Sequence, residues 1–355
     1  MSNRFVRASK YRHVFGTCVK RDLCYDNLNI TRSAHDSNLC KVNPRFISVN
    51  WQASGGAFCV IPIEQTGKMA TNVPLFAGHK APVLDTEFHP FNDFVIASGA
   101  EDCKIMIWSI PEEITENITT PVSVLSGHGK KINNLLFHPT ASNLLASSSA
   151  DLTLKLWDIE KGVQKQELLG HADQIQSMSW DFSGNLMATS ARDKIVRIFD
   201  VRSGEVVRQG SSHEGLKGSR ICWLGNSDRL ITTGFSRMSD RQLYTYDSKD
   251  LSKKLKTENI DTASGILMPF YDQDSSMLYL AGKGDGNIRY YELTDSEPYS
   301  YYLDQYKSSE PQRGMAFLPK RALNVTDNEV ARAFKVTTQS IEPISFIVPR
   351  KVLNV

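Results

Sequence analysis

The chain has 355 residues, of which 41% are hydrophobic and 23% charged, a balance typical of globular proteins with a sizeable core. Its formal net charge of +2 is too small to indicate a nucleic-acid partner, and no apolar run reaches the roughly 18 residues of a membrane span. The six cysteines include no Cys-x-x-Cys pair. This argues against a zinc site or a disulfide framework and favours reduced thiols in the cytoplasm.

The amino-terminal segment is basic. Residues 1–21 contain no Asp or Glu, and their basic side chains are Arg4, Arg7, Lys10, Arg12, Lys20 and Arg21. Such a segment attracts an acidic protein surface or a polyanion, and the alternative is a solvated basic terminus. Within it, SKYRHVFG (9–16) is strand-like and has no partner nearby in the sequence.

The segment RFISVNWQASGGAFCVIPI (45–63) predicts two strands joined by a Gly-Gly turn. A sequence repeat follows this first strand pair. Gly-His occurs at 78–79, 127–128 and 170–171, and Ser-His at 212–213. Further along, an Asp precedes an aromatic residue by six positions, as in Asp102–Trp108, Asp151–Trp157, Asp193–Phe199 and Asp240–Tyr246. Asp285–Tyr291 and Asn328–Phe334 keep this interval and are predicted to be a fifth and a sixth copy.

The repeat length predicts the architecture. Segments such as TLKLWDI and KIVRIFDV alternate apolar and polar residues, and successive histidines of the repeat are 42 to 49 residues apart. This matches the roughly 40–45 residues of a WD-repeat blade. At the carboxyl end, RGMAFLPKRAL (313–323), EVARAFKVT (329–337) and EPISFIVPR (342–350) predict three more strands.

We therefore predict an all-β fold, a seven-bladed WD-repeat β-propeller that forms a single domain over residues 1–355. An open edge invites aggregation, so strand 9–16 is expected to join the last blade and close the ring. The expected blades are approximately 38–66, 75–111, 124–160, 168–202, 210–248, 260–294 and 311–350 with 9–16.

The His and Asp residues of the repeat are interpreted as structural. Each Asp is predicted at a tight turn, within bonding reach of the repeat histidine, with a Ser or Thr four residues earlier and an aromatic residue completing a buried network. The expected members are His79, Ser98, Asp102, Trp108, His128, Ser147, Asp151, Trp157, His171, Thr189 and Asp193. The sequence shows no catalytic constellation, so we predict no enzymatic activity, no cofactor and no metal site. GKGDG (282–286) resembles a phosphate loop but is predicted to join two strands.

One repeat is modified at its tip. FSRMSDRQLYTYD (235–247) keeps the Asp-to-aromatic interval but is longer than its sister segments and places Arg237 and Arg241 around the turn. Local pairing of the two arginines with Asp240 is one interpretation, and contact with a partner is the other.

Several blocks outside the WD pattern resemble the coronin family of actin-binding WD-repeat proteins. They include SKYRHVFG (9–16), HDSNLCKVNPRFISV (35–49), TTGFSRMSDRQL (232–243), EPQRGMAFLPKR (310–321) and EPISFIVPRK (342–351). The resemblance covers essentially the whole chain and implies the seven-bladed fold. It also implies binding to the sides of actin filaments, modulation of the branching (actin-related protein) complex and of cofilin, and a place in the cytoplasm at the actin cytoskeleton and cell cortex.

The chain departs from the family pattern at two places. The family's coiled coil, which would serve oligomerisation, is absent from this chain, whose last twenty residues show no heptads. In YDNLNITRS (25–33), Asn29 stands where the family commonly has a basic residue linked to filament binding, while Arg32 lies nearby.

Because the resemblance implies an acidic filament as partner, exposed basic residues are the expected contacts. The candidates are Arg4, Arg7, Lys10, Arg12, Lys20, Arg21, Arg32, Lys130 and Lys131, with Arg237 and Arg241 as weaker ones. The alternative function is a generic WD-repeat scaffold that binds peptide segments of other proteins.

Overall fold

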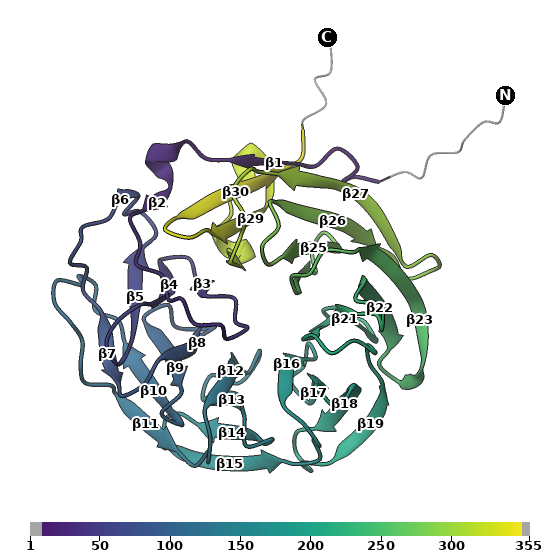
Figure 1. The fold of residues 1–355 in the computed structure, drawn as a ribbon, viewed down its shortest axis with the longest axis horizontal. Helices are drawn as coiled ribbons and strands as arrows, with labels where there is room; N and C mark the ends of the chain where they lie inside the picture. Colours follow the sequence, from purple (N-terminus) through teal and green to yellow (C-terminus); the bar gives the residue numbers. More distant parts are fainter. Residues whose placement is uncertain (1–8, 350–355) are drawn as a thin grey trace, which may run out of the picture.

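The computed structural model describes residues 9–349, which form seven β-sheets arranged like blades around a central axis (Figure 1). The predicted seven-bladed, all-β propeller is confirmed. The described residues contain thirty strands, no α-helix and three short 3-10 helices, η1 (Arg21–Leu23), η2 (Lys320–Ala322) and η3 (Val325–Asp327). No helix in residues 9–349 has the length and apolar character needed to cross a membrane.

Six of the sheets have four strands each, and in every sheet the first strand lies nearest the axis. From the axis outward, the first sheet contains β3 (Cys40–Val42), β4 (Phe46–Trp51), β5 (Gly56–Pro62) and β7 (Phe76–His79), and the second contains β8 (Val83–Phe88), β9 (Val95–Ala100), β10 (Lys104–Ser109) and β11 (Ser123–Ser126). The third contains β12 (Ile132–Phe137), β13 (Leu144–Ser149), β14 (Leu154–Asp158) and β15 (Val163–Leu168), and the fourth contains β16 (Ile175–Trp180), β17 (Leu186–Ala191), β18 (Ile195–Asp200) and β19 (Val206–Ser211). The fifth contains β20 (Arg220–Trp223), β21 (Arg229–Phe235), β22 (Arg241–Asp247) and β23 (Asp250–Asp261), and the sixth contains β24 (Leu267–Asp272), β25 (Met277–Gly282), β26 (Asn287–Leu293) and β27 (Ser300–Lys307).

The seventh sheet combines both ends of the described chain. It contains β28 (Gly314–Phe317), β29 (Glu329–Val336) and β30 (Ile341–Ile347), to which β1 (Phe15–Cys18), β2 (Tyr25–Asp26) and β6 (Gly67–Lys68) are added. Strand β1 runs antiparallel to β30, from Phe15 opposite Ile347 to Cys18 opposite Ile344. The closing strand is therefore four residues long and begins at Phe15, whereas residues 10–13 of the expected strand 9–16 form bends and a turn.

Each of the first six expected blade ranges contains the three inner strands of its sheet and omits the outermost one. The range 75–111 contains β7, which is the outermost strand of the first sheet, and only the three inner strands of the second. The reason is that each sequence repeat begins with the outer strand of one sheet and continues into the inner strands of the next. Neighbouring sheets are thereby tied together by a single repeat.

The expected sixth copy of the repeat, Asn328–Phe334, is wrong. Asn328 follows η3 in the connection between β28 and β29, and it has a left-handed backbone with φ of 55°. In the other copies the Asp lies between the second and third strands of its sheet, as Asp285 does between β25 and β26. The corresponding turn of the last sheet is 337–340, where Thr337 and Ser340 bond each other.

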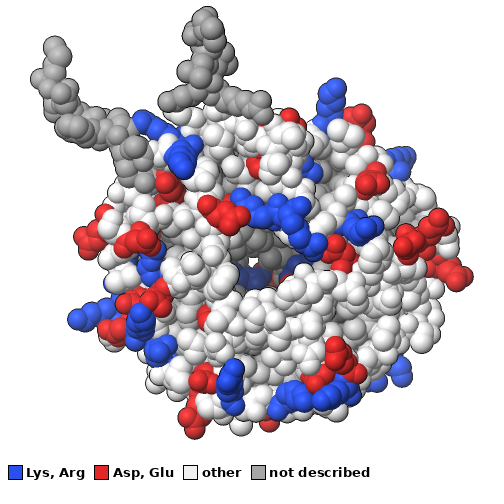
Figure 2. Space-filling model, turned by 180° about the vertical axis from the view of Figure 1, so that it is seen from behind, with Lys and Arg blue, Asp and Glu red and all other residues white. Residues whose placement is uncertain are grey.

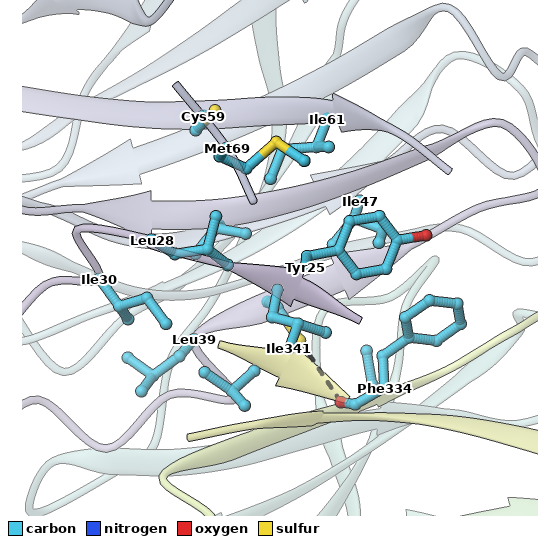
Figure 3. Close-up of a cluster of buried hydrophobic side chains, with 14 of the residues drawn as sticks. Tyr25, Leu28, Ile30, Leu39, Ile47, Cys59, Ile61, Met69, Phe334 and Ile341 are labelled. Carbon is cyan, nitrogen blue, oxygen red and sulfur yellow. Dashed lines mark hydrogen bonds between the residues drawn. The ribbon is translucent and has the colours of Figure 1, made fainter. Parts of the chain in front are cut away.

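A buried apolar cluster seals the junction between the two chain ends (Figure 3). Tyr25, Leu28 and Ile30 of the amino-terminal segment pack with Phe334 of β29 and Ile341 of β30, and all five side chains are at most 3% exposed. The hydroxyl of Tyr25 also donates a hydrogen bond to the backbone oxygen of Ile63. The amino-terminal segment thus contributes core side chains to the last sheet as well as backbone pairing.

Phe334→Ala tests how much this junction contributes to stability. Phe334 is 1% exposed, so its truncation is expected to lower the free energy of unfolding by about 3–5 kcal/mol. Urea unfolding followed by tryptophan fluorescence measures the change. Phe182→Ala is the control, because Phe182 is 58% exposed and should alter stability little. Equal effects of the two substitutions would contradict the assigned core.

Candidate interaction surface

Two copies of the repeat network contain every predicted contact. The indole N–H of Trp157 donates to Ser147 Oγ at 2.8 Å, His128 Nε2 lies 2.8 Å from the same hydroxyl, and His128 Nδ1 lies 2.9 Å from Asp151. The second copy has Trp108, Ser98, His79 and Asp102 with matching distances of 2.8, 2.8 and 3.0 Å. Because His79 ends β7 of one sheet and Asp102 follows β9 of the next, this network links neighbouring sheets.

Two further copies are incomplete. His171 Nε2 lies 2.9 Å from Thr189 and His213 Nε2 lies 2.9 Å from Thr232, but the Nδ1 atom of each histidine has no partner among the described residues. Asp193 is instead bonded to Arg197 at 2.8 Å. Burial lowers the pKa of each of these two histidines to about 4, so both are neutral at neutral pH.

The modified hairpin 235–247 contains a buried arginine and an exposed one. Arg241 is 1% exposed and donates from Nε and Nη2 to Asp261 at 2.6 Å each, and from Nη2 to Asp285 at 2.7 Å. Of the two interpretations, local pairing with Asp240 does not hold for Arg241, whose ion-pair partners are Asp261 and Asp285. The carboxylate of Asp240 accepts from Ser236 Oγ at 3.0 Å. Through Asp285, Arg241 therefore anchors the hairpin to the next sheet, and of the two arginines only Arg237 is exposed.

The turns between second and third strands all lie on one face of the ring. We call this the repeat-loop face, and it carries the turns 101–103, 150–153, 192–194 and 236–240. Strand β1 runs toward it, so Lys20 and Arg21 lie near this face and Lys10 and Arg12 near the opposite one. All four side chains are exposed. Arg4 and Arg7 lie outside the described residues.

The remaining candidates lie on the repeat-loop face but in separate places. Arg32 is exposed beside the β4–β5 turn, where its backbone N–H donates to Gln52 at 2.9 Å. Lys130 and Lys131 belong to the β11–β12 connection, on the other side of the ring from β1 (Figure 1). Asn29 is also exposed and donates from Nδ2 to the backbone of Gln52 at 2.9 Å. The fold does not gather the predicted basic residues into one patch.

Residues 31–38, which we call the cap segment, reach into the middle of the ring (Figure 1). Asp36 Oδ1 lies 2.9 Å from Arg220 of β20 and 2.8 Å from Lys283, which follows β25. His35 Nε2 lies 3.0 Å from the backbone oxygen of Asn133 in β12. Burial acts to raise the pKa of Asp36, but the cations of Arg220 and Lys283 outweigh it and hold the pKa at about 2.

The cap segment borders a cavity of about 230 Å³ at the axis, lined by Ser37, Asn38 and residues of the inner strands. Lys41 of β3, one of the residues that line the cavity, is paired with Glu87 of β8. Figure 2 shows the opening of the channel on one face, with basic and acidic side chains close together around it. Sequence reasoning missed these ion pairs because the partners are separated by 46 to 247 positions and follow no repeat interval.

Among residues 9–349, no group of three or more His, Cys, Asp or Glu side chains is arranged to hold a metal ion. The GKGDG segment joins β25 to β26, so its glycines form a strand turn.

Arg241→Ala should be far more damaging than Arg237→Ala. Removing Arg241 leaves Asp285 without its cation and Asp261 with Arg289 alone. Such a loss costs about 3–5 kcal/mol for buried pairs and less here, because both carboxylates are partly exposed. Arg237→Ala is expected to change stability by no more than about 0.5 kcal/mol. Thermal unfolding of the two variants measures the contrast, and similar losses would contradict the anchoring role.

His213→Gln is expected to change how stability depends on pH. The unfolded chain binds a proton at this histidine below its ordinary pKa of 6.5, whereas the folded chain does so only below about 4, so stability falls as pH is lowered through this window. Glutamine cannot titrate, and the slope should become shallower by up to about 1.4 kcal/mol per pH unit. Denaturant unfolding between pH 7 and 4 measures the slope. His13→Gln, at an exposed histidine, is the control.

The chain matches known protein families in sequence and a known propeller in structure. Residues 4–68 match a family described as a domain of unknown function, DUF1899, and residues 70–109, 119–158 and 162–200 match the WD domain, G-beta repeat. The WD40 domain of Toxoplasma gondii coronin is similar in structure, with a TM-score of 0.91 and 30% sequence identity over 97% of this chain and 89% of that one.

Three coronin sequences match over nearly the whole chain. Coronin-A of Dictyostelium discoideum is 53% identical over 98% of this chain and 78% of its own length, and human Coronin-2A is 44% identical over 97% and 67%. Coronin-like protein crn1 of Schizosaccharomyces pombe is 53% identical over 99% of this chain, which spans only 59% of that relative. With such identity across the complete propeller, the chain belongs to the coronin family.

Proposed function

We propose that this propeller is a non-catalytic interaction module that binds the sides of actin filaments and helps to organise the actin cytoskeleton. The observation that carries the proposal is the match to coronins over 97–99% of the chain, including the blocks outside the WD pattern. The resemblance extends the proposed partners to the branching complex and cofilin, and the proposed location to the cytoplasm at the cell cortex. No nucleic acid is proposed as a partner.

The geometry supports a role in binding. The His and Asp side chains that could suggest catalysis are used within the sheets, at distances of 2.9–3.0 Å in the complete networks. On the repeat-loop face, Lys20, Arg21, Arg32 and Lys130 are exposed and can meet an acidic partner. Complementary charge of this kind accelerates encounter and sets the orientation of the complex.

The alternative is a generic WD scaffold that binds a peptide across the middle of the repeat-loop face. The cap segment already occupies this place, held by the ion pairs of Asp36 with Arg220 and Lys283. A partner therefore meets the outer parts of the face before the axis. This observation favours an extended contact with a large surface over a peptide bound at the centre.

Co-sedimentation with filamentous actin tests the proposed function. We expect the wild-type chain to pellet with filaments and to do so less as salt rises from about 25 to 200 mM, because screening weakens charge contacts over this range. The double variant Lys20→Glu, Arg21→Glu should bind at least about tenfold more weakly, and Lys130→Glu, Lys131→Glu gives an independent test of the other side of the ring.

Lys161→Glu, Lys253→Glu is the matched control, because it changes net charge equally at two exposed lysines, one in the β14–β15 turn on the opposite face and one on the outer strand β23. Failure of the wild-type chain to pellet at low salt would argue against filament binding by this propeller. Equal weakening in the control would show a general charge effect and no specific surface.

A further inference from the structure

Two loops lie side by side above the sheet β20–β23 on the repeat-loop face. We call residues 213–218 and 236–240 the loop pair. The backbone N–H of Gly215 donates to the backbone oxygen of Phe235 at 2.8 Å, and the ammonium of Lys217 lies 4.7 Å from the ring centre of Phe235. A side chain at Gly215 would clash with the backbone oxygens of Phe235 and Ser236. The two loops are therefore in direct contact.

The loop pair exposes two large apolar side chains. Met238 is 83% exposed and Leu216 is 81% exposed, more than any other large hydrophobic residue among those the structure describes. A single exposed apolar side chain is ordinary, but two on touching loops indicate a contact surface. Methionine suits such a surface because its side chain is flexible and polarisable.

The tip that carries Met238 is ordered before any partner arrives. Ser236 Oγ accepts from the backbone N–H groups of Met238 at 3.1 Å and Asp240 at 3.0 Å, and the Ser236 N–H donates to the backbone oxygen of Asp240 at 2.7 Å. At the base of the tip, Arg241 is fixed by ion pairs to Asp261 of its own sheet and to Asp285 of the next sheet. A rigid tip lowers the entropy lost on binding.

Basic side chains surround these apolar ones. Arg237 and Lys217 lie on the loop pair itself, and Arg192 and Lys194 lie on the neighbouring β17–β18 turn, where Lys194 Nζ donates to the backbone oxygen of Glu214 at 2.7 Å. The acidic groups nearby are the exposed Glu214, Asp240, whose carboxylate is bonded within the tip, and Asp193, which is paired with Arg197. The surroundings of Met238 and Leu216 therefore have an excess of positive charge.

We propose that the loop pair is a filament contact in which Met238 and Leu216 enter an apolar recess of the actin filament, while Arg237, Lys217 and Lys194 meet carboxylates around it. The proposal rests on the proposed function and names a part of the surface that performs it. An apolar centre within a charged rim is the arrangement in which a few residues supply most of the binding energy. It also explains why this repeat retains its skeleton and differs at its tip.

Methionine oxidation provides a direct test. Met238 is 83% exposed, whereas the other described methionines, Met69, Met106, Met178, Met187, Met268, Met277 and Met315, are at most 9% exposed. Among the methionines that the structure describes, dilute hydrogen peroxide should therefore oxidise Met238 first in the free chain, and peptide mass spectrometry follows its sulfoxide. Saturating filaments should slow oxidation of Met238 at least about fivefold, as expected for a side chain buried in the centre of an interface.

The outcomes separate this inference from the proposed function. If the wild-type chain pellets with filaments but Met238 is oxidised at the rate of the free chain, the loop pair is not the contact and the inference is overturned. If the wild-type chain does not pellet, the proposed function itself fails.

Substitution gives the second test. The double variant Leu216→Ala, Met238→Ala should bind filaments at least about tenfold more weakly while its unfolding temperature stays unchanged, because both side chains are exposed. Met238→Leu keeps an apolar side chain and should retain most of the affinity. Val122→Ala, Val163→Ala is the control, at valines 71% and 45% exposed on the outside of the ring. Wild-type affinity in the Leu216, Met238 variant would overturn the inference.

Discussion

Closure of the ring by the amino-terminal segment is the constraint on which the rest of this structure depends. Without β1 and β2, the edge of β30 would be an unpaired strand, and without Tyr25 and Leu28 the apolar faces of Phe334 and Ile341 would meet water. Since every sheet packs on two neighbours, loss of this single junction would loosen the sheets on both sides. The positions of all surface loops therefore depend on a contact between the two ends of the chain.

The sheets are further joined by the repeat networks, which are not equivalent. The copies at His79 and His128 contain a histidine–carboxylate bond, whereas those at His171 and His213 lack it. In the fifth sheet Arg241 performs the linking role through Asp285 of the next sheet, while Asp261 of its own sheet holds the guanidinium in place. With the link supplied by a buried arginine, the turn 236–240 is free to differ from its sister turns. Stability and recognition are thus carried by neighbouring residues of one hairpin.

The candidate surface was only partly predictable. Lys20, Arg21, Arg32, Lys130 and Lys131 were identified by charge, and all five belong to loops of one face, yet the fold separates them around the ring. The cap segment was not predicted, because Asp36 meets Arg220 and Lys283 from distant sheets and ion pairs leave no periodic signal. The exposure of Met238 could not be read from its hydrophobicity, which by itself favours burial.

The sequence by itself determined the seven-bladed, all-β architecture and the members of the two complete repeat networks, because period-two strands and a recurring Asp-to-aromatic interval are local properties. It also carried the blocks that identify the family. Only the tertiary structure decided that Asn328 is no repeat Asp, that the closing strand begins at Phe15, and that Arg241 is buried while Met238 is exposed. Those outcomes depend on which sheet each segment meets. The physical reason is that burial and pairing are set by neighbours distant in the chain, which local sequence patterns do not specify.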